Sequence, residues 1–365
     1  MITGLVTMHF KKQANNRDDL KKSYQSIRER TVEICKNLEA EDMAVQPTGD
    51  VSPPKWHLGH TTWFFEEFIL MPYDLGFKRF DKDLLVVFNS YYKSAGEHWP
   101  QVERGQLSRP TVKKVLEYRK YIDELTLDFL DSAAPNAEVD LLLEVGLNHE
   151  QQHQELLLMD IKYILGVNPN SPIYCDLNLP LSKEASQDVC NFQEGIYEVG
   201  NRSLDFSYDN ENPSHKTYIY PFSIRQSFVT NGDYLNFVKS DGYQNPKFWL
   251  SEGLNWVEKN SVVCPLYWRK MNDDWYEFTL HGLRPLDMNA PVTHVSYFEA
   301  DAFANWSGMR LPTEFELEIF LRNYGENFVT TDGLFHPNNA GTPIGQVWSW
   351  SKSQYSSYPG FRTLT

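Results

Sequence analysis

The chain carries two histidines in a run of helical character. Residues 141–160 read LLLEVGLNHEQQHQELLLMD, and His149 and His153 lie four positions apart within it. On an α-helix such residues lie one turn apart on the same face. That face continues through Leu142, Val145, Gln152 and Leu156. Burying two imidazoles costs free energy unless each finds a partner, so the pattern predicts either a metal site or hydrogen-bonded core histidines.

The same residues match HExxH, a motif with which zinc peptidases bind their metal. That mechanism needs Glu150 as general base and a third ligand, from HExxHxxGxxH or from a carboxylate on a later helix. The residues after His153 offer no glycine or histidine at the required offsets. Beyond the string QELLLMD that follows His153, the next acidic residues fall in a segment of linker composition: Asp176, Glu184 and Asp188. A zinc peptidase is therefore the weaker interpretation.

Two further histidines lie in an earlier helical segment, WHLGHTTWFFEE. His57 and His60 are three positions apart, so they point in similar directions and either can face the pair at 149 and 153. Two imidazoles from one helix and one from another would leave coordination positions open. Such a site suits Fe(II) that meets a thiol and O₂, but it suits zinc as well, so spacing does not choose the metal.

The elements that must position these histidines are helices in the first half of the chain. Helical patterns cover about 17–40, 52–70, 111–131 and 138–165. Ser52 is expected to cap the second helix, Pro53 to open it, and Gly166 to close the fourth. A long aromatic loop separates the second and third helices. Four helices with one long crossover predict a bundle.

The second half changes character after a polar, proline-dotted segment. We expect a helical bundle at 1–166, a linker at 167–190 and an irregular α+β domain at 191–365. Two helices are expected in the last domain, at 296–309 and 313–323. The fold class is thus multidomain, α followed by α+β.

The totals exclude several function classes. With 365 residues two domains are the natural expectation, and the net charge of −15 without a basic block argues against a nucleic-acid partner. The four cysteines show no CxxC spacing, and the N-terminus lacks a sustained apolar region with a cleavage site. No stretch approaches the roughly 20 apolar residues of a membrane span. A cytoplasmic protein is expected.

Three segments together resemble the ergothioneine-biosynthesis sulfoxide synthases: WHLGHTTWFFEEFIL, FNSYYKSAGEHWPQVERGQLSRPT and NHEQQHQELLLMDIKYIL. In that family a DinB-like four-helix bundle precedes a formylglycine-generating-enzyme-like domain, which has a C-type-lectin-like fold. The strings PVTHVSYFEADAFANWSGMRLPTEFELE and GQVWSWSKSQYSSYPGFR resemble hallmarks of the second domain. The resemblance covers nearly the whole chain, and FNSYY is closest to the branch that accepts cysteine instead of γ-glutamylcysteine.

The resemblance implies a role for each residue that matches a family motif. The iron ligands would be His60, His149 and His153, with His57 supporting them. Gln152 would contact the histidine-derived substrate, and Tyr91 or Tyr92 would supply an active-site phenol. Arg104 and Arg109 would hold a substrate carboxylate. The alternatives are arginines of a solvated loop and tyrosines that only pack.

The implied reaction joins cysteine or γ-glutamylcysteine to the imidazole of hercynine, with Fe(II) as cofactor and O₂ as oxidant. The alternatives are a 5-histidylcysteine sulfoxide or selenium-analogue synthase, a DinB-like metal-dependent thiol transferase without oxygen chemistry, and an inactive binding partner. Family members continue beyond the position where this chain stops, at FRTLT. We therefore expect truncation, a second polypeptide that completes the domain, or a different closure.

Overall fold

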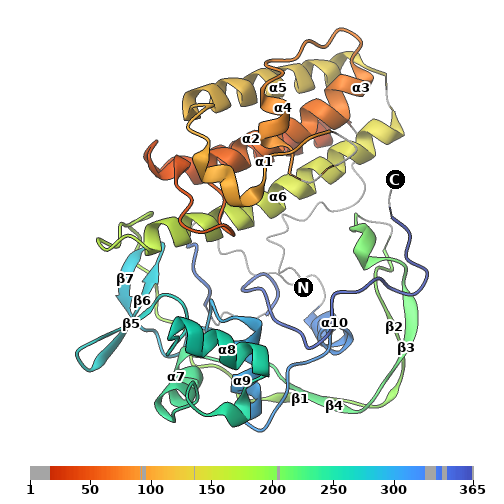
Figure 1. Cartoon of the computed structure of the whole chain (residues 1–365). Coiled ribbons are helices and arrows are strands. Elements are labelled where there is room, and N and C mark those ends of the chain that lie inside the picture. The colour runs from red at the N-terminus through yellow and green to blue at the C-terminus, as the bar shows by residue number, and fades with distance from the viewer. Residues whose placement is uncertain are drawn as a thin grey trace. The chain divides into compact units, whose positions relative to one another are not determined.

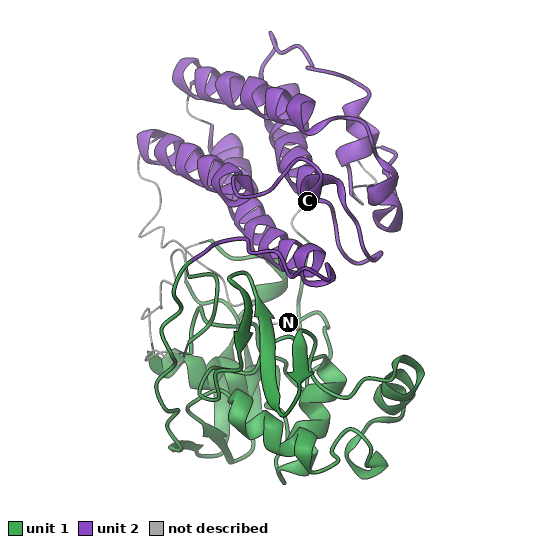
Figure 2. Cartoon of the chain, turned by 90° about the vertical axis from the view of Figure 1, so that its left-hand side faces the viewer, with its two compact units in different colours: residues 1–6, 177–365 green, residues 7–176 purple. Residues whose placement is uncertain are grey.

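The computed structural model of the chain describes residues 17–90, 92, 96–134, 136–203, 206–324, 334–338 and 343–363. These residues form two compact units, one that ends at Asp176 and one that begins at Leu177 (Figure 2). The division falls inside the linker expected at 167–190, although the exact domain boundaries stay a prediction. Among the described helices, none has the length and apolar character that crossing a membrane requires.

Four long helices build the first unit, as the sequence predicted. They are α1 (Arg17–Cys35), α2 (Pro54–Phe65), α5 (Val112–Ser132) and α6 (Ala137–Gly166). Helix α1 packs along α6, and α2 packs against both α5 and α6 (Figure 1). The long crossover between α2 and α5 contains shorter elements: η2 (Glu66–Leu70), α3 (Met71–Tyr73), α4 (Leu84–Phe88) and η4 (Gln101–Gln106). A single turn, η1 (Asp42–Ala44), precedes α2.

Helix α2 is the central element of the bundle, and all twelve of its residues are buried. A helix that is covered on all sides is typical of a core position. Its start differs from the expectation, because Pro53 is the N-cap and Pro54 opens the first turn, without a side-chain cap. The hydroxyl of Ser52 instead accepts a hydrogen bond from Arg104, at 2.8 Å. The prediction that Ser52 caps the helix is therefore wrong.

A buried polar network ties the four helices together. Arg28 of α1 donates to Glu150 of α6 at 2.9 Å, to Asp123 of α5 at 2.6 Å and to Thr62 of α2 at 2.9 Å. Arg119 of α5 forms a second ion pair with Glu150. Because each of these charged groups has a partner, the network fixes how the helices sit against one another.

The second unit combines small antiparallel sheets with short helices. Strand β1 (Val189–Phe192) pairs with β4 (Phe222–Arg225), and β2 (Gly195–Val199) pairs with β3 (His215–Ile219). A third sheet contains β5 (Trp268–Met271), β6 (Asp274–Thr279) and β7 (Gly282–Pro285). The helices are α7 (Asn231–Lys239), α8 (Ser251–Asn260), α9 (Tyr297–Trp306) and α10 (Glu314–Leu321), with the turns η5 (Asp209–Glu211), η6 (Pro246–Phe248) and η7 (Arg322–Tyr324).

This architecture confirms the expected mixed α and α+β fold. Helices α9 and α10 lie where the sequence placed them, whereas α7 and α8 were not predicted. Strand β1 begins at Val189, within the segment assigned to the linker. All four cysteines are described, and none forms a disulfide.

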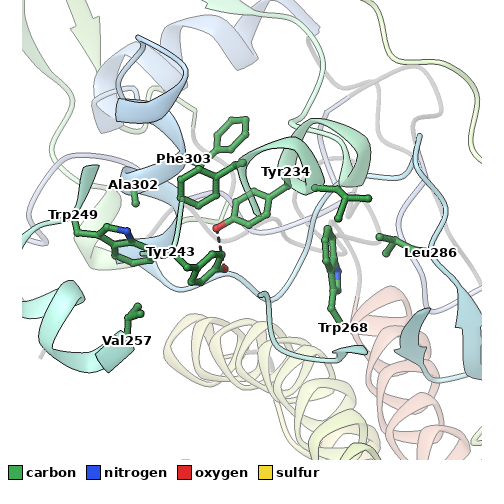
Figure 3. Close-up of a cluster of buried hydrophobic side chains, with 10 residues drawn as sticks. Tyr234, Tyr243, Trp249, Val257, Trp268, Leu286, Ala302 and Phe303 are labelled. Carbon is green, nitrogen blue, oxygen red and sulfur yellow. Dashed lines mark hydrogen bonds between the residues drawn. The ribbon is translucent and has the colours of Figure 1, made fainter. Parts of the chain in front are cut away.

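Aromatic side chains dominate the core of the second unit (Figure 3). Tyr234 of α7 stacks on Phe303 of α9, and its hydroxyl lies 3.3 Å from that of Tyr243. The Tyr243 hydroxyl donates to a carboxylate oxygen of Glu299 at 2.6 Å. Glu299 also closes the capping box of α9 with Ser296. One buried carboxylate thus joins the start of α9 to the aromatic core.

Candidate metal centre

Three histidines from two helices converge in the bundle. His60 of α2 and His149 and His153 of α6 each place a ring nitrogen within 4.8 Å of the other two. The two helices are in contact along this stretch (Figure 1). The structure therefore brings together the three residues that the sequence proposed as ligands, while their binding of a metal stays a prediction.

The orientation of His60 is set by the backbone of α4. Its Nδ1 lies 2.7 Å from the carbonyl oxygen of Phe88, the last residue of that helix. Carbonyl groups in the last turn of a helix have no intrahelical partner, so they are free to accept. The indole of Trp56 uses the neighbouring carbonyl of Val87 in the same way, at 3.0 Å. With its proton held at Nδ1, a neutral His60 presents the lone pair of Nε2.

That lone pair faces a second imidazole. The Nε2 atoms of His60 and His149 are 3.2 Å apart. The other ring nitrogen of His149, Nδ1, is buried and has no hydrogen-bond partner among the described residues. Buried polar atoms are rarely left unpaired, so hydrogen bonds alone do not satisfy this cluster. Three imidazole nitrogens that converge in this way fit a divalent transition metal.

His153 is held by a chain of two further side chains. Its Nδ1 lies 2.8 Å from Nδ1 of His57, and Nε2 of His57 lies 2.8 Å from a carboxylate oxygen of Asp160. His57 lies outside the group of three converging histidines, and it contacts His153 directly. Its supporting role stays a prediction. Since the Nδ1 atom of His153 is engaged, Nε2 is the nitrogen left for a metal.

The three imidazoles are neutral at physiological pH. Burial lowers the pKa of His149 to about 4, despite the opposing effect of the nearby carboxylate of Glu150. Burial and the neighbouring imidazole of His149 hold the pKa of His60 and of His153 well below the usual range. Neutral imidazole is the form that binds a metal, so the bundle keeps these residues ready as ligands.

Glu150 is committed to the helix-packing network. Its two carboxylate oxygens accept hydrogen bonds from Arg28 at 2.9 Å, from Thr31 at 2.6 Å and from Arg119. Although burial alone would raise the pKa of Glu150, the two guanidinium groups lower it to about 2. A carboxylate with so low a pKa is a weak base, and these oxygens are already engaged by three donors, so Glu150 is poorly suited to accept a proton in catalysis. These contacts argue against the zinc peptidase interpretation.

Trp56 links the histidines to Arg104, one of the two predicted substrate arginines. Its ring stacks on that of His60 with 4.6 Å between the centroids, and the guanidinium carbon of Arg104 lies 3.3 Å from the Trp56 centroid. Arg104 is buried, whereas Arg109 is exposed and donates to the Ser108 carbonyl at 3.3 Å. The structure places Arg104 close to the cluster. The role of both arginines in carboxylate binding stays a prediction.

The remaining predicted site residues fall in different positions. Tyr92 packs its ring against Trp63 and Phe68, with centroid separations of 5.6 and 5.4 Å. Its backbone is held by the side chain of Asn89, which accepts from the Tyr92 N–H at 3.1 Å. Gln152 is half-buried on α6. Tyr91 lies outside the described residues.

Sequence reasoning missed three residues that organise the site. Asp160 lies seven positions after His153, two helical turns along the same face of α6. Its spacing could therefore have indicated that it faces α2, where it contacts His57. Asn89 follows directly after the end of α4, where asparagine commonly turns the chain. Phe88 contributes only its backbone carbonyl, and no side-chain pattern predicts that.

Comparisons with known proteins agree with this division of the chain. Residues 179–363, just over half of the chain, match the sulfatase-modifying factor enzyme 1-like domain family. Residues 23–157, which contain the histidine cluster, match the DinB superfamily.

Three similar proteins have names that refer to hercynine or to ergothioneine. A hercynine oxygenase of Mycolicibacterium smegmatis is 28% identical over 65% of this chain, which spans 61% of that relative. A hercynine oxygenase of Mycobacterium tuberculosis is 26% identical over 92% of this chain and 83% of its own length. Ergothioneine biosynthesis protein 1 of Schizosaccharomyces pombe is 27% identical over 51% of this chain and 24% of its own length.

Proposed function

The chain belongs to the sulfatase-modifying factor enzyme 1-like family, in the ergothioneine-biosynthesis branch that also carries a DinB domain, and on this premise we propose its reaction. We propose a non-heme Fe(II)- and O₂-dependent sulfoxide synthase. It would form a C–S bond between cysteine, or γ-glutamylcysteine, and the imidazole of hercynine. The observation that carries the proposal is the convergence of His60, His149 and His153 within 4.8 Å.

The reaction balances with O₂ as the sole oxidant. The thiol and the imidazole C–H each give up one hydrogen, and a C–S bond forms between them. One oxygen atom ends on sulfur as the sulfoxide, and the other leaves as water with the two hydrogens. No further reductant is required.

The chain's own residues would hold the cofactor and place the substrates. Three neutral imidazoles leave open positions on a bound ion, and Fe(II) there would activate O₂ and bring thiol and imidazole together. The positive charge of Arg104 is close enough to help lower the pKa of His60, so Arg104 is suited to bind a substrate carboxylate near the metal site. Tyr91 or Tyr92 would deliver a proton during sulfur oxidation.

The test is a single-turnover reaction of the whole chain. The protein is loaded with Fe(II) without oxygen, mixed with hercynine and cysteine, and then exposed to ¹⁸O₂. We expect O₂ consumption and a sulfoxide that carries one labelled oxygen, detected by mass spectrometry. Parallel reactions with γ-glutamylcysteine and with unmethylated histidine identify the preferred substrates.

Two variants connect the reaction to the proposed ligands. His60→Ala should lose bound iron and product together, because only two ligands remain. His98→Ala, which changes an exposed histidine, should behave like the unmodified chain. A chain that binds the metal but shows neither O₂ uptake nor a C–S product would instead favour a thiol transferase, and unchanged iron content in His60→Ala would refute the three-histidine site.

A further inference from the structure

Resting on the proposed function, we propose that Asp160 and His57 form a positioning pair that sets the tautomer of His153 and thereby tunes the affinity of the metal site. Asp160 and His57 belong to different helices, α6 and α2. Both lie outside the set of three candidate ligands, and they act on the metal site only through His153.

The proton positions follow from the order of the three groups. The Asp160 oxygen that accepts from the Ser52 N–H also lies 2.8 Å from Nε2 of His57, so that nitrogen is the donor and carries the hydrogen. With its hydrogen on Nε2, the His57 ring accepts at Nδ1, 2.8 Å from Nδ1 of His153. His153 must therefore donate from Nδ1, which leaves a lone pair at Nε2. A carboxylate that acts through an imidazole in this way raises the basicity of the final nitrogen.

Asp160 and His57 are both held in place by the surrounding fold. The same oxygen of Asp160 accepts a second hydrogen bond from the backbone N–H of Ser52, at 3.0 Å. His57 is 2% exposed, so water does not replace its partners readily. Burial with specific partners on both ring nitrogens holds the ring in one orientation. The position of Asp160 thus also ties the segment before α2 to the end of α6.

A purely structural role makes a different prediction. If the pair only packs α2 against α6, its loss lowers the stability of the fold and leaves the protonation of His153 unchanged. If it sets the tautomer, loss of the acceptor shifts the His153 proton and weakens metal binding. The two roles are separable because one readout needs neither a metal nor substrates.

The experiment uses the full chain with ¹⁵N-labelled histidine. Long-range ¹H–¹⁵N correlation spectra of the metal-free protein report which nitrogen of His153 carries the proton, with His153→Ala for assignment. We expect Nδ1–H in the unmodified chain and a shift toward Nε2–H in Asp160→Ala and His57→Phe. Chelator competition with Co(II) should show an affinity loss of about 10- to 100-fold in both variants. His57→Gln keeps one donor and one acceptor and should recover part of the affinity.

Asp140→Ala is the matched control. Asp140 lies on the same helix, about two turns before the histidines, and its ion pair with Arg17, at 3.6 Å, is far from them along α6. It should leave the tautomer and the Co(II) affinity unchanged. The inference is overturned if Asp160→Ala and His57→Phe keep both properties, or if the folded chain binds no Co(II). Failure of the C–S reaction with normal Co(II) binding would count against the proposed function alone.

Discussion

At the scale of single residues, the state of each imidazole in the cluster depends on its second nitrogen. The Phe88 carbonyl holds the proton of His60, and His57 engages Nδ1 of His153. His149 has no such partner among the described residues. The three candidate ligands are therefore not equivalent, and we expect His149 to have the greatest freedom to reorient on metal binding.

Glu150 offers the clearest test of a residue that sequence motifs misassign. Glu150→Ala should lower the free energy of unfolding by about 3–5 kcal/mol, because Arg28 and Arg119 would remain buried without their partner. Urea unfolding measures the change. Glu138→Ala, an exposed change on the same helix, should alter stability by less than about 1 kcal/mol. A catalytic general base would show the opposite pattern, with lost activity and normal stability.

At the scale of elements, α4 reaches His60 only because α2 has a glycine at position 59. A Cβ atom built on Gly59 would lie 2.2 Å from the ring of Phe88, which is 1% exposed. Gly59→Ala should therefore push Phe88 and its carbonyl away from His60, with a stability loss of about 1–3 kcal/mol. Chelator competition should show weaker Co(II) binding. Gly76→Ala, where the nearest atom is 3.4 Å away, is the control, and equal affinities would show that Phe88 does not position His60.

The stability of the second unit should depend on pH because of Glu299, in the first turn of α9. Burial raises the pKa of Glu299, so the folded state binds this proton more tightly than the unfolded chain does. Its contribution to stability is complete below the unfolded pKa of about 4.3 and is lost as pH rises through the folded pKa. Glu299→Gln should flatten that decline in calorimetric unfolding. Glu252→Gln, which is exposed, should keep the slope of the unmodified chain, and parallel profiles for all three would contradict the prediction.

The helices of the chain were largely predictable from the sequence, whereas the contacts between helices were not. Apolar periodicity and glycine or proline boundaries located α5, α6, α9 and α10, because these signals are local. The one-turn spacing of His149 and His153 predicted a shared face for the same reason. The contacts of Phe88 and Asp160 depend on how helices pack, and a backbone carbonyl has no sequence signature. Helices α7 and α8 each contain a glycine, Gly232 and Gly253, and glycine weakens the local helical signal.

At the scale of the whole molecule, the predicted metal site belongs to the first unit alone. The contacts described above for the three histidines come from residues before Leu177: Trp56, Phe88 and His57, which Asp160 holds in turn. The DinB match ends at residue 157, and the second family match begins at 179. Metal binding and the complete reaction should therefore be separable properties of the chain.

A fragment of residues 1–176 tests this separation. Because it retains the buried network and the hydrogen-bond partners of the histidines, it should fold as a helical unit and bind Co(II) within about threefold of the full chain's affinity. It should form no C–S product, if the second domain contributes to the substrate site. Circular dichroism verifies folding before the metal titration. A folded fragment with lost affinity would mean that residues after 176 hold the metal site together, and a fragment with full activity would assign the reaction to the bundle alone.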